Sequence, residues 1–153
     1  MGKLEKQLKV IKARDIMTTS VVTIKAEMPL YDVANLMLEK KISGVPVTTT
    51  NGDIEGVATI TDLFLAMGII KYSAPIENEK VPSKEPIVRS IMTKEVITIT
   101  EDETLGSIID IMIHRGVHTL PVVRDGKMIG VIGRRDVVRQ FYLSLEDIFK
   151  NKL

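Results

Sequence analysis

Residues 14–24 read RDIMTTSVVTI, and residues 89–99 read RSIMTKEVITI. The second stretch begins 75 positions after the first, and Pro46 and Pro121 are separated by the same 75 positions. Self-similarity at a fixed offset is typical of a duplicated structural unit. The sequence therefore predicts two tandem copies of one unit.

The copies differ in length by one residue, and the difference falls at a predicted turn. Asp62 and Asp136 are 74 positions apart, so one residue is lost between the prolines and these aspartates. The first copy has an Asn-Gly pair at 51–52 in this region, and the second has an Asp-Gly pair at 125–126. Both dipeptides favour tight hairpin turns, where a change in length is well tolerated.

Each copy is predicted to fold in the order β-α-β-β-α. In the first copy, a short extended run at residues 21–24 precedes a helical apolar pattern over residues 30–38. In the second copy, residues 96–99 precede a matching pattern over residues 105–113. Two strands flank each hairpin turn, and a last helix is expected to begin near each of the two aspartates.

The expected fold class is mixed α/β, with two βαββα units related by pseudo-twofold symmetry. One unit is too small to cover its own sheet, so the two copies are expected to pack sheet to sheet. Gly44 and Gly116 are expected to end the first helix of each copy. The expected divisions are a basic N-terminal arm at 1–12, the first copy at 13–70, a linker at 71–86, the second copy at 87–145 and a tail at 146–153.

The composition argues against several classes of protein. The 153 residues include 21 Lys and Arg against 20 Asp and Glu, so the whole chain has almost no bias toward nucleic acid or membrane. There is no cysteine, which excludes disulfides, thiol catalysis and thiolate metal sites and fits a reducing cytoplasm. The longest plain apolar run, residues 63–70, is far shorter than the roughly 20 residues that span a bilayer. The N-terminus has no apolar stretch of the kind found in secretory signals. We therefore expect a cytoplasmic protein.

The repeated motifs resemble the cystathionine β-synthase (CBS) domain. The IM-T-x-x-V-x-T-I motif is followed by GVPV or LPVV and then by GVATITD or GVIGRRD, and the resemblance covers nearly all of residues 13–143. It implies a tandem CBS pair, or Bateman module, that binds an adenosine ligand between the two copies. It also implies a regulatory, energy-sensing role toward a separate protein, with AMP, ADP, ATP or S-adenosylmethionine as ligand and with no catalysis.

The resemblance implies a nucleotide site at Thr59 and Asp62. The family pattern places a hydroxyl residue and an aspartate three and six positions after a glycine, and the first copy matches it with Gly56, Thr59 and Asp62. One carboxylate can accept charge-assisted hydrogen bonds from both ribose hydroxyls. A second interpretation is that Asp62 only caps the following helix, a role that Asp favours. The two roles are compatible.

The second copy departs from this pattern. Asp136 is present, but Gly133 stands where the first copy has Thr59. The substitution removes one hydroxyl contact to a ligand and adds local backbone freedom. The second site is therefore expected to be weaker, empty or suited to another ligand.

The resemblance also implies which residues cover the adenine. It places Val96 and Ile97 beside the Thr59/Asp62 site, and Val21 and Val22 beside the Asp136 site. Apolar side chains at these positions can cover the flat base. Ordinary core packing is the alternative for each of them.

Phosphate groups need donors or positive charge. His118 and Arg135 supply both in the second copy and are expected to serve the Thr59/Asp62 site, whereas the equivalent positions in the first copy are Ser43 and Thr61. The alternatives are a structural histidine and a solvated arginine. His114 and His118 have a spacing that metal ligands use, but Gly116 lies between them and no third histidine exists, so we expect no metal.

The sequence leaves other functions open. A nucleic-acid-binding regulator would use the arm, in which lysines recur every third position and apolar residues form another face. The same pattern suits a helix that packs on a neighbouring subunit. A nucleotide hydrolase is disfavoured because no motif marks a nucleophile with its base. A partner-binding protein without a ligand is a further alternative, and the regulated partner stays unnamed.

The last helix of each copy predicts a homodimer. Residues 63–70 are apolar all round, and residues 137–145 carry more apolar side chains than one stripe needs. Two chains placed side by side would bury these helices in a twofold four-helix contact. The alternative is that the arm and the linker cover both helices within one chain.

Overall fold

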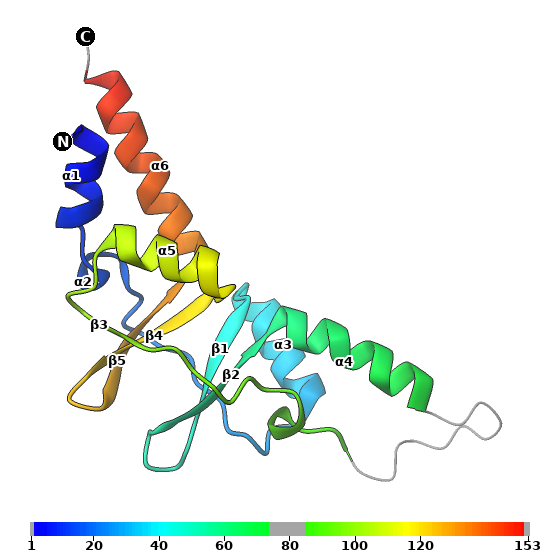
Figure 1. Ribbon diagram of the computed structural model, residues 1–153. Coiled ribbons are helices and arrows are strands. Elements are labelled where there is room, and N and C mark those ends of the chain that lie inside the picture. Colours follow the sequence, from blue (N-terminus) through cyan, green and yellow to red (C-terminus); the bar gives the residue numbers. More distant parts are fainter. Residues whose placement is uncertain (1, 74–84, 152–153) are drawn as a thin grey trace. The chain divides into compact units, whose positions relative to one another are not determined.

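The structure is a computed structural model that describes residues 2–73 and 85–151. The chain divides into two compact units (Figure 1). Unit 1 comprises Met1–Val21 and Ile97–Leu153, and unit 2 comprises Val22–Val96. Residues 74–84, on which most of the expected linker falls, lie outside the described residues. None of the helices in the described ranges is long and apolar enough to cross a membrane.

Unit 2 contains a two-stranded antiparallel sheet flanked by helices. Its elements are α3 (Leu30–Lys40), β1 (Gly44–Thr48), β2 (Ile54–Thr59), α4 (Ile60–Ser73) and the 3-10 helix η1 (Val88–Ser90). Strands β1 and β2 form the predicted hairpin, with Val45 opposite Ala58. The extended run at 21–24 contributes only one parallel bridge, between Ile24 and Val47.

Unit 1 contains a three-stranded sheet in the order β3-β4-β5. Strand β3 is parallel to β4, and β4 is antiparallel to β5, with Leu120 opposite Ile132. The β-α-β-β-α order predicted for the second copy is therefore confirmed. The elements of unit 1 are α1 (Lys3–Val10), α2 (Ala13–Ile16), β3 (Ile99–Thr100), α5 (Leu105–Arg115), β4 (Thr119–Arg124), β5 (Lys127–Gly133) and α6 (Arg134–Lys150).

The leading segment of each copy pairs with the other copy's hairpin. In unit 1, Thr18 and Val131 exchange two backbone hydrogen bonds of 2.9 and 3.0 Å. In unit 2, Thr93 and Val57 exchange two bonds of the same lengths. These residues are equivalent in the two copies. We call residues 11–18 and 86–93 the exchanged segments, because each completes a unit whose hairpin belongs to the other copy.

Glycines let the exchanged segments approach the hairpins closely. A Cβ atom on Gly56 would lie 2.8 Å from the carbonyl oxygen of Thr93 and 2.9 Å from Sδ of Met92. A Cβ atom on Gly130 would lie 2.6 Å from Sδ of Met17. Side chains at these two strand positions would collide with the exchanged segments, so glycine is the residue that fits there.

Ion pairs fasten both exchanged segments in the same way. Arg14 pairs with Asp102 in unit 1, and the equivalent Arg89 pairs with Glu27 in unit 2 at 2.5 Å. The hydrogen bond from Arg89 holds the pKa of Glu27 below its ordinary value. These groups lie at the surface, where such pairs contribute little each.

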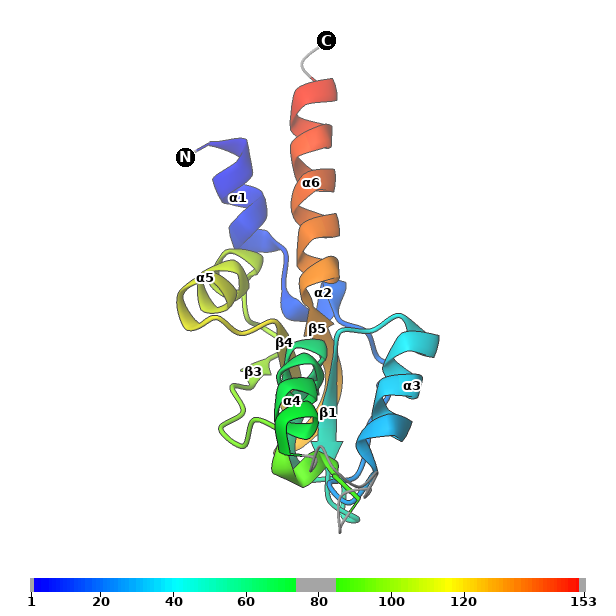
Figure 2. The same ribbon diagram turned by 90° about the vertical axis from the view of Figure 1, so that its right-hand side faces the viewer.

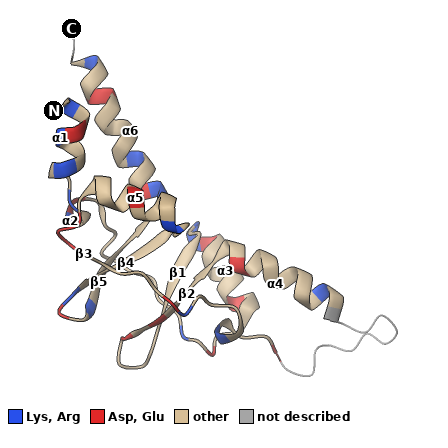
Figure 3. Cartoon of the chain, viewed as in Figure 1, with Lys and Arg blue, Asp and Glu red and all other residues tan. Residues whose placement is uncertain are grey.

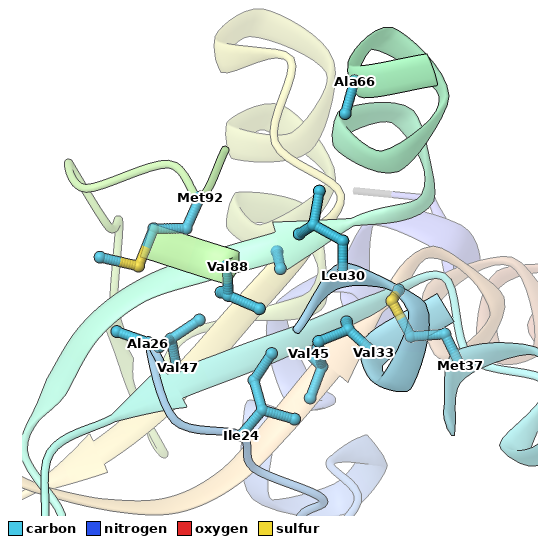
Figure 4. Packing of buried hydrophobic residues seen from close by; sticks show 11 residues of the cluster. Ile24, Ala26, Leu30, Val33, Met37, Val45, Val47, Ala66, Val88 and Met92 are labelled. Atoms are coloured by element: carbon cyan, nitrogen blue, oxygen red, sulfur yellow. The ribbon is translucent and has the colours of Figure 1, made fainter. Parts of the chain in front are cut away.

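Each unit has its own hydrophobic core, and the predicted helical pattern supplies part of it. In unit 2, Val33 and Met37 of α3 pack with Ile24 and Val45 (Figure 4). Leu38 belongs to the same predicted pattern but is 70% exposed. In unit 1 the core contains Ala13, Ile99, Leu105, Ile108, Met112, Leu120, Val122, Ile132 and Val137.

The helix ends agree with the prediction in one copy only. Gly116 has a φ of 62° and ends α5, as predicted. In unit 2 the left-handed residue is Lys41, with a φ of 55°, and Gly44 is the first residue of β1. The expectation that Gly44 ends the helix is therefore wrong. The turn in unit 1 has positive φ at both Asp125 and Gly126, as tight hairpin turns of this type require.

The basic arm forms helix α1 and packs within unit 1. It contacts both α5 and α6, and Figures 1 and 2 show α1 and α6 side by side. Leu8 lies against Gly106 of α5. A Cβ atom built on Gly106 would lie 3.5 Å from the Cβ atom of Leu8. The apolar face of the arm is thus covered by its own chain, while Lys3, Lys6 and Lys9 are exposed.

Candidate nucleotide site

The turn from β2 into α4 holds Thr59 and Asp62 in a reciprocal hydrogen-bonded pair. The backbone N–H of Thr59 donates to Oδ2 of Asp62 at 2.8 Å. The backbone N–H of Asp62 donates to Oγ1 of Thr59 at 3.1 Å. This is a capping box, which satisfies two backbone donors at a helix start. The capping role expected for Asp62 is therefore confirmed.

The cap also fixes the position of the carboxylate. Asp62 is the third residue of α4 and is partly buried, so its side chain is held at the N-terminal end of the helix. The capping bond uses Oδ2 and leaves Oδ1 outside it. A fixed acceptor of this kind suits a pair of vicinal hydroxyl donors.

The equivalent turn in unit 1 retains half of this arrangement. The backbone N–H of Gly133 donates to Oδ2 of Asp136 at 2.8 Å, but no hydroxyl returns a bond. The other carboxylate oxygen of Asp136 lies 3.7 Å from Nη1 of Arg139. Sequence analysis did not single out Arg139. A comparison of the two copies could have found it, because the equivalent residue in the first copy is Leu65.

The backbone at Gly133 would accept another residue. Its φ of −102° and ψ of 171° are ordinary extended values. A Cβ atom built there would meet only Oδ2 of Asp136, at 3.7 Å. The backbone conformation at this position therefore does not require glycine, and a residue with a hydroxyl group could occupy it.

The expected phosphate-binding residues are exposed. His118 directly precedes β4, and Arg135 is the second residue of α6, so both belong to unit 1. His118 and the neighbouring Arg134 line an apolar groove of about 480 Å³ between α5 and α6. Ser43 is exposed before β1 in unit 2, and its carbonyl oxygen accepts the backbone N–H of Ile60 at 3.0 Å.

The four residues expected to cover the adenine are all partly buried. Val22 packs against the core of unit 2, and Ile97 packs against the core of unit 1. The core alternative therefore holds for these two. Among the described residues, Val21 and Val96 belong to neither core cluster, and these two positions are equivalent in the two copies. Contact with the base stays a prediction for all four.

Within the described ranges, His114 of α5 and His118, which follows this helix, belong to no metal cluster. His114 Nδ1 lies 2.9 Å from the carbonyl oxygen of Asp110. Over residues 2–73 and 85–151, no three His, Cys, Asp or Glu side chains gather in a way that could hold a metal ion.

The aspartates that cap the last helix of each copy, the hairpins and the duplication agree with one known family. The family model described as CBS domain matches residues 13–69 and again residues 88–150. The chain belongs to the CBS domain family. The two matches correspond to the two copies found in the sequence and together account for most of the chain, so the predicted tandem CBS pair is confirmed.

Individual relatives are similar to this chain in sequence or in fold. An uncharacterised 17.7 kDa protein of Acidianus ambivalens is 27% identical over 129 residues, which are 84% of this chain and 71% of that protein. A putative acetoin utilization protein from Vibrio cholerae has a TM-score of 0.73 at 24% identity, covering 92% of this chain and 96% of that one. The structure of CBSX2 in complex with AMP has a TM-score of 0.70 at 26% identity, covering 89% of this chain and 98% of that one.

Proposed function

We propose that this CBS pair is a regulatory module that binds an adenosine ligand and catalyses no reaction. The observation that carries the proposal is the complete Thr59/Asp62 cap, which fixes a carboxylate at a helix start. The likeness to CBSX2, whose structure contains AMP, supports an adenine nucleotide as the ligand. AMP, ADP, ATP and S-adenosylmethionine are the candidates.

Each site residue has a distinct part in the proposed binding. Asp62 accepts hydrogen bonds from the two ribose hydroxyls while the backbone N–H of Thr59 holds the carboxylate in place, and the Thr59 hydroxyl adds a third contact to the ligand. Val96 and Ile97 cover the adenine, and His118 and Arg135 neutralise the phosphates. At the second site, Asp136 and the apolar Val21 and Val22 would repeat this arrangement, but Arg139 lies near the carboxylate and the hydroxyl is missing.

A ligand panel tests the proposal directly. The melting temperature of the chain is measured with AMP, ADP, ATP and S-adenosylmethionine, and calorimetry is applied to any ligand that raises it. Ligands that bind only the folded state raise its stability in proportion to the logarithm of their concentration. Guanosine monophosphate is the matched control for the base. If no adenosine ligand shifts the melting temperature at millimolar concentration, the proposal fails.

We also infer that the chain forms a homodimer. The support is the exposure of apolar side chains on α4, where Phe64 and Ile69 are each 67% exposed and Tyr72 is 81% exposed. Together with α3, this helix borders a second apolar groove of about 460 Å³. Apolar patches of this kind mark interaction surfaces. Light scattering should give twice the 17.0 kDa mass of one chain, and a mass of one chain at micromolar concentration overturns the inference.

A further inference from the structure

The two carboxylate oxygens of Asp136 in unit 1 have different surroundings. Oδ2 accepts the capping hydrogen bond from the backbone N–H of Gly133 at 2.8 Å. Oδ1 lies 3.7 Å from Nη1 of Arg139. Because the cap engages Oδ2, a ligand at this site would depend mainly on Oδ1, and this is the oxygen that the guanidinium approaches.

The position of Arg139 follows from helix geometry. It comes three residues after Asp136 on α6, and side chains three positions apart lie on the same face of a helix. The side chain of Asp136 is 19% exposed, whereas that of Arg139 is 67% exposed. A largely enclosed carboxylate thus has an exposed guanidinium beside the oxygen that lies outside the cap. A ligand that uses this oxygen has to displace the guanidinium.

The first half of α6 is basic, as Figure 3 shows, but its three arginines are not equivalent. Successive helix residues are rotated by about 100°, so Arg139 lies about 60° around the helix from Asp136. Arg135 is about 100° away and Arg134 about 160° away. Arg134 lines the apolar groove between α5 and α6 instead. Arg139 is therefore the arginine that shares a helix face with the carboxylate.

The first copy supplies an internal comparison. Its equivalent capping bond, from the backbone N–H of Thr59 to Oδ2 of Asp62, is also 2.8 Å long. The residue equivalent to Arg139 is Leu65, which is 63% exposed and whose side chain has no hydrogen-bond donor. The two copies thus share the aspartate and its capping bond, and they differ in whether a cation follows three residues later.

We propose that Arg139 is a specificity-determining residue of the second site, which disfavours a ribose there by competing with its two hydroxyls for Oδ1 of Asp136. The inference rests on the proposed function and deepens it, since it explains why two similar aspartates bind the same sugar differently. At Asp62 the hydroxyls meet a carboxylate without a competing cation at the equivalent position. At Asp136 the same hydroxyls have to break an ion pair first.

This competition is separate from the missing hydroxyl at Gly133. In the first copy, Oγ1 of Thr59 accepts the backbone N–H of Asp62 at 3.1 Å and so acts on the backbone of the aspartate. Arg139 acts on the carboxylate instead. Replacing Arg139 should therefore strengthen ribose binding even with glycine at position 133. Exposed ion pairs change an equilibrium constant by up to about fivefold, which sets the size of the expected gain.

A nuclear magnetic resonance titration with adenosine tests the proposal at each site separately. The backbone N–H groups of Gly133 and Thr59 each donate to one of the two aspartates, so their signals report the second and the first site. Adenosine carries both ribose hydroxyls and no charge, so removing a cation does not change its long-range attraction to the protein. In Arg139→Leu, which copies Leu65, the dissociation constant from the Gly133 signal should fall about fivefold. The constant from the Thr59 signal should stay the same.

Two further readouts separate competition from a structural effect. The ligand 2′-deoxyadenosine lacks one of the two hydroxyls, so Arg139→Leu should improve its binding less. Raising the salt from about 0.1 M to 1 M shortens the Debye length from about 10 Å to 3 Å and weakens the ion pair. Adenosine should therefore bind the second site of the unmodified chain more tightly in high salt, and this gain should be absent in Arg139→Leu. Arg139→Lys keeps a cation and should retain both the weak binding and its salt dependence.

Lys150→Leu is the matched control. It removes a cation from the same helix and breaks an ion pair, with Glu146 four residues earlier. This pair lies about 15 to 21 Å along the helix axis from Asp136. The substitution should leave adenosine binding unchanged at both sites.

The proposal is overturned if Arg139→Leu leaves the second-site constant unchanged while the first site still binds adenosine. It is also overturned if the gain is as large for 2′-deoxyadenosine, or if Lys150→Leu reproduces it, because the arginine would then not compete for the hydroxyls. These outcomes leave the proposed function standing. If neither signal responds to adenosine or to AMP, the proposed function fails as well.

Discussion

Replacing Asp62 separates ligand binding from helix capping. The Asp62→Ala variant loses the acceptor for the backbone N–H of Thr59, a bond of 2.8 Å. Loss of a helix cap costs about 1 kcal/mol of stability. The substitution also removes the carboxylate that we propose accepts hydrogen bonds from the ribose, and hydrogen bonds to charged groups contribute roughly 1.5–3 kcal/mol. We therefore expect the ligand dissociation constant to rise about 10- to 100-fold.

Two further variants isolate these contributions. Asp62→Asn keeps an oxygen that can accept the capping bond, so its stability should remain near that of the unmodified chain while ligand binding still weakens. Asp136→Ala removes the equivalent bond, from the backbone N–H of Gly133 at 2.8 Å. It should therefore lose similar stability with little effect on the stronger site.

Calorimetry with the best ligand of the panel, together with thermal melts, measures both quantities for each variant. The reasoning is refuted if Asp62→Ala remains folded and binds with unchanged affinity. It is equally refuted if Asp136→Ala weakens the stronger site as much as Asp62→Ala does, since the two aspartates would then not differ as proposed.

Three other changes have defined expectations. Gly133→Thr should complete the second cap and strengthen binding at the Asp136 site, so a calorimetric titration should fit two sites of more similar affinity. Gly56→Ala should destabilise the fold by about 1–3 kcal/mol because its Cβ atom would meet a backbone oxygen at 2.8 Å; Gly68→Ala, which has open space, should not lower the melting temperature. Arginine hydrogen bonds lower the pKa values of Glu27 and Glu101 in the folded state. Their stabilising contribution is therefore present above the ordinary glutamate pKa of about 4.3 and is lost as the pH falls through the lowered values. The melting temperature should therefore fall between pH 6 and pH 3. Added salt, or Glu→Gln changes at both positions, should make this fall smaller.

The sequence predicted the repeated unit well because its signals are local. The helical patterns, the hairpin turns and the capping aspartates each depend on residues close together in the chain, and the structure contains all of them. The first strand of each copy was less predictable. Residues 21–24 form only the Ile24 bridge, and residues 96–99 give a strand at Ile99–Thr100. A run of four apolar and β-branched residues does not fix how many of them pair.

Long-range features of the site escaped prediction for a different reason. A duplicated sequence does not reveal whether a segment packs on its own copy or on the other, because both copies present the same apolar pattern. The exchange therefore became visible only in the structure, as did the position of His118 beside the α5–α6 groove. The left-handed Lys41 was also missed, since lysine seldom adopts this conformation and gives no sequence signal.

The exchanged segments also bear on how the chain folds. Residues 11–18 and 86–93 are each separated by a large part of the chain from the hairpin they complete. Neither copy therefore contains every segment of one unit, and folding has to wait for distant parts of the chain to meet, which slows it. A molecule with one copy could complete such a unit only by exchanging this segment with a second molecule, as in domain swapping. With two copies in one chain the exchange is intramolecular, so its effective concentration is set by the connecting residues and not by the protein concentration.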